Sequence, residues 1–443
     1  MRELLKSDNW LSGLQWLFFI FTNTVVIPIT VGAAFDLSQE RITSLLQLSF
    51  IVTGLACMAQ TLFGHKRAIM EGQSGLWWGV ILTLCTTAAA QGMPLSVVGG
   101  SLAVGIIISG VLSAIIGLAG MGPYIAKLFN PSVMGVFMFL LGCQLVGIFL
   151  KGMLGIPFGQ NSQSATIDLS VSLLSIVIAV IVIIITVKAP SSIRRYGLLI
   201  GIIIGWIAYS LFFGQQESGG QTAVNSSGIA LFPLGKPAWD IGIIITAILT
   251  GLLNTANTFG SLKGTDRFYN TPISSTDYRS SFSITGIFIV LAGLLGLVPY
   301  TPYVSSIGFL SQTGIIKRLP LVLGGFLFLL MGVIPPVGHF FSMLPLSIGS
   351  AVLFVAYVQL LLSAWEFFQQ VSFNTINIFR SSIPLFVGIV IMTMPASYFS
   401  TLPGIIRPLL SSGLLVGILL ALVLENAFAW DRYGTSVDKT KSQ

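Results

Sequence analysis

Residues 71–78 read Glu-Gly-Gln-Ser-Gly-Leu-Trp-Trp, and residues 301–308 read Thr-Pro-Tyr-Val-Ser-Ser-Ile-Gly. Both stretches interrupt apolar runs with glycine, proline, amide or hydroxyl side chains. A membrane-embedded chain tolerates such interruptions where the irregular backbone lies buried in protein or lines a cavity. The two stretches therefore predict two broken spans, each partly extended and each followed by a half-helix.

The sequence around them is typical of a polytopic membrane protein. Of the 443 residues, 54% are hydrophobic and only 8% are charged, which is about a third of the charged share in soluble domains. A soluble fold could not cover its surface with so few charges, whereas a helical bundle facing lipid needs few. Lysine and arginine occur singly or in pairs between apolar runs. The net charge of +7 therefore indicates membrane topology and argues against a nucleic-acid partner.

Hydropathy predicts an all-α integral membrane protein with about 14 spans. The first half contains the predicted spans 14–35, 42–63, 74–90, 98–119, 130–150, 170–188 and 195–213. The second half contains 240–262, 282–300, 304–315, 319–338, 340–362, 378–396 and 403–426. If the N-terminus is cytoplasmic, all but four of the 21 lysines and arginines lie inside, the exceptions being Arg41, Lys151, Lys236 and Arg407. This bias predicts a multi-pass protein of the cell (plasma) membrane with both termini cytoplasmic.

Two equal halves that enter the membrane from opposite sides form an inverted repeat, which is common in secondary transporters. Faint internal matches support this arrangement at nearly one spacing: residues 131–135 resemble 345–349, and residues 197–201 resemble 413–417. The broken third and tenth spans are then equivalent, and a substrate site is expected where they meet.

Polar residues in and near these spans are the candidate substrate ligands. The main candidates are Gln73, Ser74 and Gly75 in the third span, Asn254 in the eighth, and Ser305, Ser306 and Gly308 in the tenth. Secondary candidates are Gln15, Trp16, Glu71, Trp77, Thr258 and Thr313. The alternative is that the small and polar residues serve helix packing and hydrogen bonds between helices. No catalytic group, metal site or cofactor is expected.

At these residues the chain resembles the nucleobase–cation symporter-2 family, also called the nucleobase–ascorbate or xanthine/uracil permeases. The resemblance extends over nearly the whole chain. The stretches that carry it are Gln15-Trp16, residues 72–76, residues 130–135, residues 231–237 and residues 305–313.

The resemblance implies a purine-type nucleobase permease that works by alternating access, and a homodimer is common in the family. It implies a core domain in two parts, 14–119 (spans 1–4) and 240–338 (spans 8–11). A gate domain would also have two parts, 130–213 (spans 5–7) and 340–426 (spans 12–14). The segment 214–239 would be a linker, and 427–443 a cytoplasmic tail.

The chain also departs from the family at the expected titratable positions. Asn254 stands where the family has a glutamate tied to proton coupling, Ser305 replaces an acid or amide, and Trp16 replaces a histidine. An amide does not carry a proton at physiological pH, so these departures argue against coupling to H⁺ or Na⁺. Glu71 is the acid nearest the predicted site, and a surface ion pair with Lys66 and Arg67 is the simpler explanation for it.

Three other functions remain open from the sequence. A carrier of the same architecture for a small anion fits the missing carboxylates, because helix N-termini attract anions. A non-transporting sensor is the second alternative. The third is an intramembrane serine protease, suggested by Gly72-Gln73-Ser74-Gly75 together with His339, although the match is short.

Overall fold

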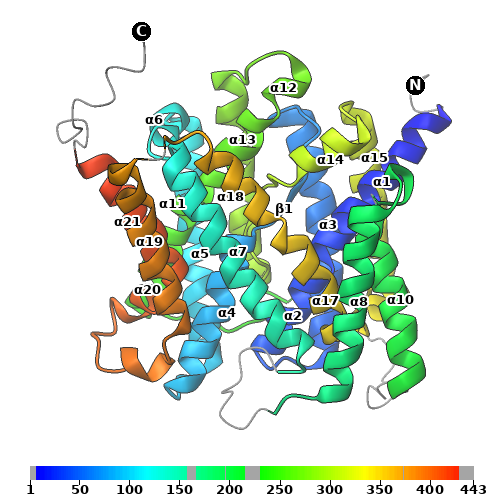
Figure 1. The fold of residues 1–443 in the computed structure, drawn as a ribbon, viewed down its shortest axis with the longest axis horizontal. Helices are drawn as coiled ribbons and strands as arrows, with labels where there is room; N and C mark the ends of the chain where they lie inside the picture. The colour runs from blue at the N-terminus through cyan, green and yellow to red at the C-terminus, as the bar shows by residue number, and fades with distance from the viewer. Residues whose placement is uncertain (1–5, 157–165, 195, 215–229, 373, 429–443) are drawn as a thin grey trace.

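The computed structural model describes residues 6–156, 166–194, 196–214, 230–372 and 374–428. These residues fold into helices and two short strands (Figure 1). Contacts between the helices group them into two bundles, each of which draws on both halves of the chain. The predicted linker and tail lie partly outside the described residues.

The first bundle contains both strands and the spans around them. Its elements are α1 (Ser7–Thr24), α2 (Val26–Ala34), α3 (Gln39–Phe63), β1 (Glu71–Gln73), α4 (Gly75–Ala90), α5 (Leu95–Leu118), α11 (Ile241–Gly264), α12 (Asp266–Tyr269), α13 (Ser275–Leu295), β2 (Tyr300–Pro302), α14 (Ser306–Thr313) and α15 (Arg318–Val333). Within it, α13 and α11 pack on α5, and α15 packs on α3 and α1.

The second bundle is built around α7. Its elements are α7 (Pro131–Met153), α8 (Leu169–Lys188), α9 (Ser191–Arg194), α10 (Gly197–Phe213), α17 (Leu346–Val358), α18 (Leu360–Phe368), α19 (Thr375–Thr393), the 3-10 helix η2 (Ala396–Phe399), α20 (Arg407–Leu410) and α21 (Gly413–Ala427). The short helices α6 (Gly122–Ala126) and α16 (Pro335–Ser342) lie in the connections between the bundles.

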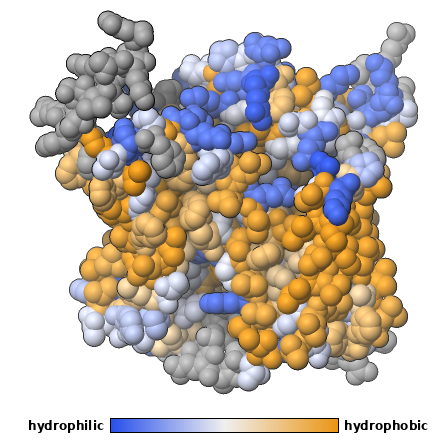
Figure 2. Space-filling view, viewed as in Figure 1, coloured by the Kyte–Doolittle hydropathy of each residue, from blue (hydrophilic) through white to orange (hydrophobic). Residues whose placement is uncertain are grey.

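The surface of the molecule fits a lipid environment. Hydrophobic residues form a broad band across its middle, and hydrophilic residues gather at the end where α12 lies (Figure 2). Among the described residues, nine helices are long and apolar enough to cross a membrane, or ten if the bent pair α14 and α15 counts as one span. The shorter apolar helices are α4, α10 and α21. The all-helical membrane fold is thus confirmed, while the number of 14 crossings stays a prediction.

The two described ends of the chain lie on one side. The beginning of α1 and the end of α21 lie at the same end of the molecule as α12 (Figure 1). Ion pairs join segments at this end, Lys66 with Asp277 at 3.2 Å and Arg67 with Asp266 at 2.6 Å. The charged residues of these loops, which the sequence predicts to be cytoplasmic, therefore lie at the same end of the molecule.

Three predicted boundaries are wrong because hydropathy overlooks polar first turns and proline. Helix α1 begins at Ser7 and not at 14. Helix α13 begins at Ser275 and not at 282, because the hydroxyl of Ser274 accepts from the N–H of Asp277 and caps a polar first turn. The span predicted at 340–362 is instead formed by α17 and α18, because Pro345 precedes a new helix.

The segment before α11 is held tightly in the first bundle. Phe232, at a positive φ of 56°, donates its N–H to the carbonyl of Leu294 at 2.8 Å. Glycines of α5 allow this segment to approach, since an added Cβ at Gly100 would lie 1.9 Å from the carbonyl oxygen of Lys236. We infer that this segment fastens α5 to the C-terminal end of α13.

Replacing Gly100 with alanine is therefore expected to lower stability by about 1–3 kcal/mol through overpacking. The backbone carbonyl of Lys236 cannot yield as a flexible side chain would. Thermal unfolding of the detergent-solubilised protein measures the effect. Gly147→Ala is the matched control, because this helical glycine of α7 has no atom within 4 Å of an added Cβ. Equal melting temperatures for the two variants would contradict the fastening role.

Candidate substrate-binding site

The broken third and tenth spans meet in a two-stranded crossing. Strand β1 pairs antiparallel with β2, with Gly72 opposite Thr301. The pairing is extended at both ends, since the N–H of Ser74 donates to Pro299 O and the N–H of Tyr303 donates to Met70 O, each at 2.8 Å. We call residues 70–75 and 299–306 the crossing. The predicted pair of broken, extended segments is thereby confirmed, and the two lie in direct contact.

Each strand of the crossing leads into a half-helix whose first turn carries no side-chain cap. Ser74 precedes α4 and Ser305 precedes α14, and neither side chain caps its helix. The first N–H groups of a helix lack partners within the helix and carry a partial positive charge. The first turn of α4 thus offers backbone donors to a ligand rich in acceptor oxygens, whereas on α14 the N–H groups of Ser306 and Ile307 already donate to Tyr303 O and Val304 O.

Asn254 of α11 ties the crossing together. Its Oδ1 accepts from Ser74 Oγ at 2.6 Å and from Asn257 Nδ2 at 3.1 Å. Its Nδ2 donates to the carbonyl of Tyr300 at 3.2 Å. Both lone pairs of the amide oxygen are therefore used inside the protein, which leaves one N–H of Asn254 for a ligand.

Polar atoms without partners lie buried in the crossing. Both amide atoms of Gln73 and the hydroxyl of Thr301 are buried and make no hydrogen bond. Such atoms are rare in native proteins and cost roughly 1–3 kcal/mol each. Since Gln73 offers a donor and an acceptor together, a ligand that carries both would satisfy it.

Two tyrosines that the sequence reasoning did not select support the crossing. The hydroxyl of Tyr303 donates to the carbonyl of Gln73 across the crossing. Tyr357 of α17 lies beside Gly75, where an added Cβ would meet its Cε1 at 3.6 Å and Leu145 Cδ1 at 3.1 Å. For both tyrosines, the signal available in the sequence was a ring with a polar hydroxyl inside an apolar span. The second bundle therefore contacts the first turn of α4 directly.

The contact between the bundles continues along α4. The ring of Trp78 lies 5.0 Å from that of Phe149 and 6.2 Å from that of Tyr357. By contrast, Ser305 is exposed, and an added Cβ at Gly308 would meet no atom within 4 Å. The start of α4 is thus covered by aromatic rings, whereas one face of α14 is uncovered.

The remaining candidates lie in several environments. Ser306 accepts from the N–H of Met70 at 3.0 Å and so belongs to the crossing. Trp16 is wholly buried with its ring 4.3 Å from Phe309, and Trp77 is wholly buried in α4. Gln15 is half-buried on α1, and Thr258 is buried one turn beyond Asn254 on α11. The hydroxyl of Thr313 bonds to Phe309 O within α14.

The surface ion pair expected for Glu71 is wrong. Lys66 and Arg67 instead pair with aspartates after α11, because the chain turns inward between them and β1. The carboxyl group of Glu71 is fully buried and faces α13, where it accepts from Thr285 Oγ1 at 2.7 Å.

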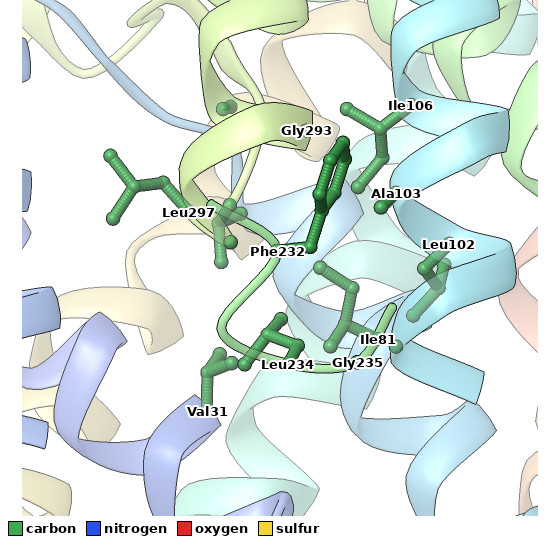
Figure 3. A pocket seen from close by; sticks show the side chains of 14 residues that line it. Val31, Ile81, Leu102, Ala103, Ile106, Phe232, Leu234, Gly235, Gly293 and Leu297 are labelled. Carbon is green, nitrogen blue, oxygen red and sulfur yellow. The ribbon is translucent and has the colours of Figure 1, made fainter. Parts of the chain in front are cut away.

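An apolar pocket lies outside the crossing. It is a pocket in the first bundle where Phe232, Leu234 and Gly235 approach α5 and α13 (Figure 3). Its other lining residues include Val31, Ile106 and Leu297, and all its labelled side chains are apolar (Figure 3). Such a lining has no group to orient a polar substrate, so this pocket is a gap beside the fastened segment.

A crossing of two half-helices inside a lipid-facing bundle defines a membrane transport protein, a permease. The chain belongs to the Permease family, because the family model Xan_ur_permease matches residues 8–397. The transporter class and the family predicted from the sequence are thereby confirmed, and the chain is a transporter and not an enzyme.

Similar proteins agree with this assignment. The putative purine permease YwdJ of Bacillus subtilis (strain 168) is 29% identical over 432 residues, covering 95% of this chain and 96% of that protein. The xanthine permease of the same organism is 24% identical, covering 93% and 92%. Among solved structures, the transmembrane domain of the cyanobacterial bicarbonate transporter BicA has a TM-score of 0.63 at 16% identity, covering 95% of this chain and 98% of that one.

Proposed function

We propose that this permease carries purine nucleobases, with oxopurines such as xanthine as the preferred class. The observation that carries the proposal is the crossing, in which the two uncapped half-helices meet beside Asn254 and the unpartnered amide of Gln73. An oxopurine presents carbonyl oxygens and N–H groups along one edge. The carbonyls would accept from the first N–H groups of α4, and the edge would pair with the amides.

We propose that the first bundle acts as the core domain and the second as the gate. The predicted bounds are 14–119 and 240–338 for the core, and 130–213 and 340–426 for the gate. Contacts of Tyr357 and Leu145 with Gly75 support relative motion at this boundary, since the gate touches the core beside the site. We further propose that the protein lies in the plasma membrane as a homodimer with cytoplasmic termini.

A carrier for a small inorganic anion is the second candidate. The likeness to the BicA fold and the uncapped helix N-termini favour it. An inorganic anion such as sulfate only accepts hydrogen bonds, however, and would leave the buried Oε1 of Gln73 without a donor. We therefore favour the nucleobase.

Transport by the purified protein in liposomes tests the proposal. Labelled xanthine should exchange across the membrane, and unlabelled purines should compete while uracil, bicarbonate and sulfate compete weakly. Competition by the anions alone would support the second candidate. Absence of any transport, with intact protein and substrate binding, would identify a sensor.

A further inference from the structure

We propose that Glu71 is the proton-binding residue that couples this permease to the proton gradient. The inference rests on the proposed function, because it assigns the coupling ion of the same carrier. Asn254, which is bonded to the crossing, is an amide and carries no proton, so another group must titrate if the carrier is coupled. Glu71 is the carboxylic acid built into the crossing.

The position of Glu71 is unusual for an acid. Its side chain is fully buried, its Oε1 accepts from Thr285 Oγ1 at 2.7 Å, and its Oε2 has no partner. Among the described residues it forms no ion pair, since Arg67 and Lys66 are bound to Asp266 and Asp277. A buried carboxylate without a counter-charge is costly, whereas the protonated acid is not. Binding and release of a proton therefore change the energy of this site strongly.

Thr285 links the Glu71 carboxyl group to a neutral amide of α3. Gln60 of α3 donates from Nε2 to Thr285 Oγ1 at 2.8 Å, and its own Oε1 is buried without a partner. Glu71 Oε2 is likewise buried without a partner, and an ionised carboxylate has no donor of its own. One proton on Oε2 supplies the donor that this group lacks.

The other titratable groups around Glu71 do not replace it. On α3, the thiol of Cys57 donates to the Glu71 carbonyl at 3.2 Å. Tyr300 of β2 and Tyr303, which follows β2, also lie near Glu71, and the Tyr300 hydroxyl is hydrogen-bonded to Thr53. The side chains of Thr285 on α13 and Gln60 on α3 are neutral. The charged residue of α1 is Asp8, which lies in the first turn of that helix. In the loop after α3, burial and then the charge of Arg67 lower the pKa of His65 to about 3, so it stays neutral at physiological pH. Glu71 is thus the carboxyl group of the crossing that can bind and release a proton.

The geometry also links the proton to the substrate. Glu71 and Gln73 are alternate residues of the same strand, and β1 continues into the first turn of α4. A negative charge on Glu71 opposes the positive potential at the half-helix N-termini, whereas the neutral acid leaves it intact. An oxopurine with oxygens at these N-termini therefore binds more tightly when Glu71 is protonated, and by linkage it favours proton uptake.

Proton movement in liposomes, followed with an enclosed pH dye, tests the inference. Addition of xanthine to wild-type liposomes should acidify the lumen, and a gradient of one pH unit should raise accumulation by about tenfold. Glu71→Gln should still exchange labelled xanthine between the two sides but should move no protons. Glu366→Gln on α18, an exposed acid outside the crossing, should behave as wild type.

A second variant tests the assignment even if Glu71→Gln does not fold. Thr285→Val removes the hydrogen bond that favours the ionised carboxylate, so the pH midpoint of xanthine uptake should shift upward. Xanthine-driven proton uptake that persists in Glu71→Gln, an unchanged pH profile in Thr285→Val, or uptake driven by Na⁺ at equal pH would overturn the assignment. If wild type does not exchange xanthine at all, the proposed function fails instead.

Discussion

Replacing Asn254 with alanine is expected to lower the rate of purine exchange by at least about tenfold while the protein still reaches the membrane. The substitution removes the acceptor of Ser74 Oγ and the donor to the Tyr300 carbonyl. Each buried group left without a partner costs roughly 1–3 kcal/mol. Initial rates of labelled xanthine exchange in liposomes, normalised to folded protein, measure the loss.

The matched control for this variant is Asn23→Ala. Asn23 is also an intramembrane amide, but its Nδ2 bonds only to Phe19 O of its own helix, at 2.8 Å. Its replacement should change exchange by less than about twofold. If Asn254→Ala keeps wild-type exchange and the same order of competing purines, Asn254 neither holds the crossing nor binds substrate.

The broken spans were predictable because their chemistry is local. Glycine, proline and hydroxyl residues at 71–78 and 301–308 interrupt apolar runs, and the structure has a short strand and a half-helix at each. The register that places Gly72 opposite Thr301 was not predictable, since strand pairing between distant segments leaves little trace in one sequence.

The partners of individual polar residues were harder to predict. Asn254 was expected to face the substrate, but most of its hydrogen-bonding capacity is used on Ser74, Asn257 and Tyr300. Glu71 was expected to pair with its basic neighbours in sequence, yet the chain turns inward between them. Both differences involve a contact between distant residues, since Ser74 lies 180 residues from Asn254 and Thr285 lies 214 residues from Glu71. Hydropathy and spacing carry no information on such contacts.

The boundary between the two bundles gives the second large effect. Replacing Gly75 with leucine is expected to lower xanthine exchange by about tenfold to a hundredfold. The leucine side chain would enter the space now held by Leu145 and Tyr357. It would also crowd the first turn of α4, where the proposed substrate accepts its hydrogen bonds. Exchange rate and xanthine binding are both measured, because a blocked gate slows exchange even where binding survives.

Two further variants separate the loss of movement from the effect of added bulk. Gly75→Ala adds a single carbon that would lie 3.1 Å from the flexible end of Leu145, so exchange should fall only slightly. Gly147→Leu adds the same bulk to α7 at a helical glycine with no atom within 4 Å of an added Cβ, and it should exchange as wild type. A loss of exchange that grows from Gly75→Ala to Gly75→Leu, with no loss in Gly147→Leu, fits a contact beside the site that moves during transport. If Gly75→Leu exchanges xanthine freely, the bundles do not close on the start of α4 during transport, and the gate must act elsewhere.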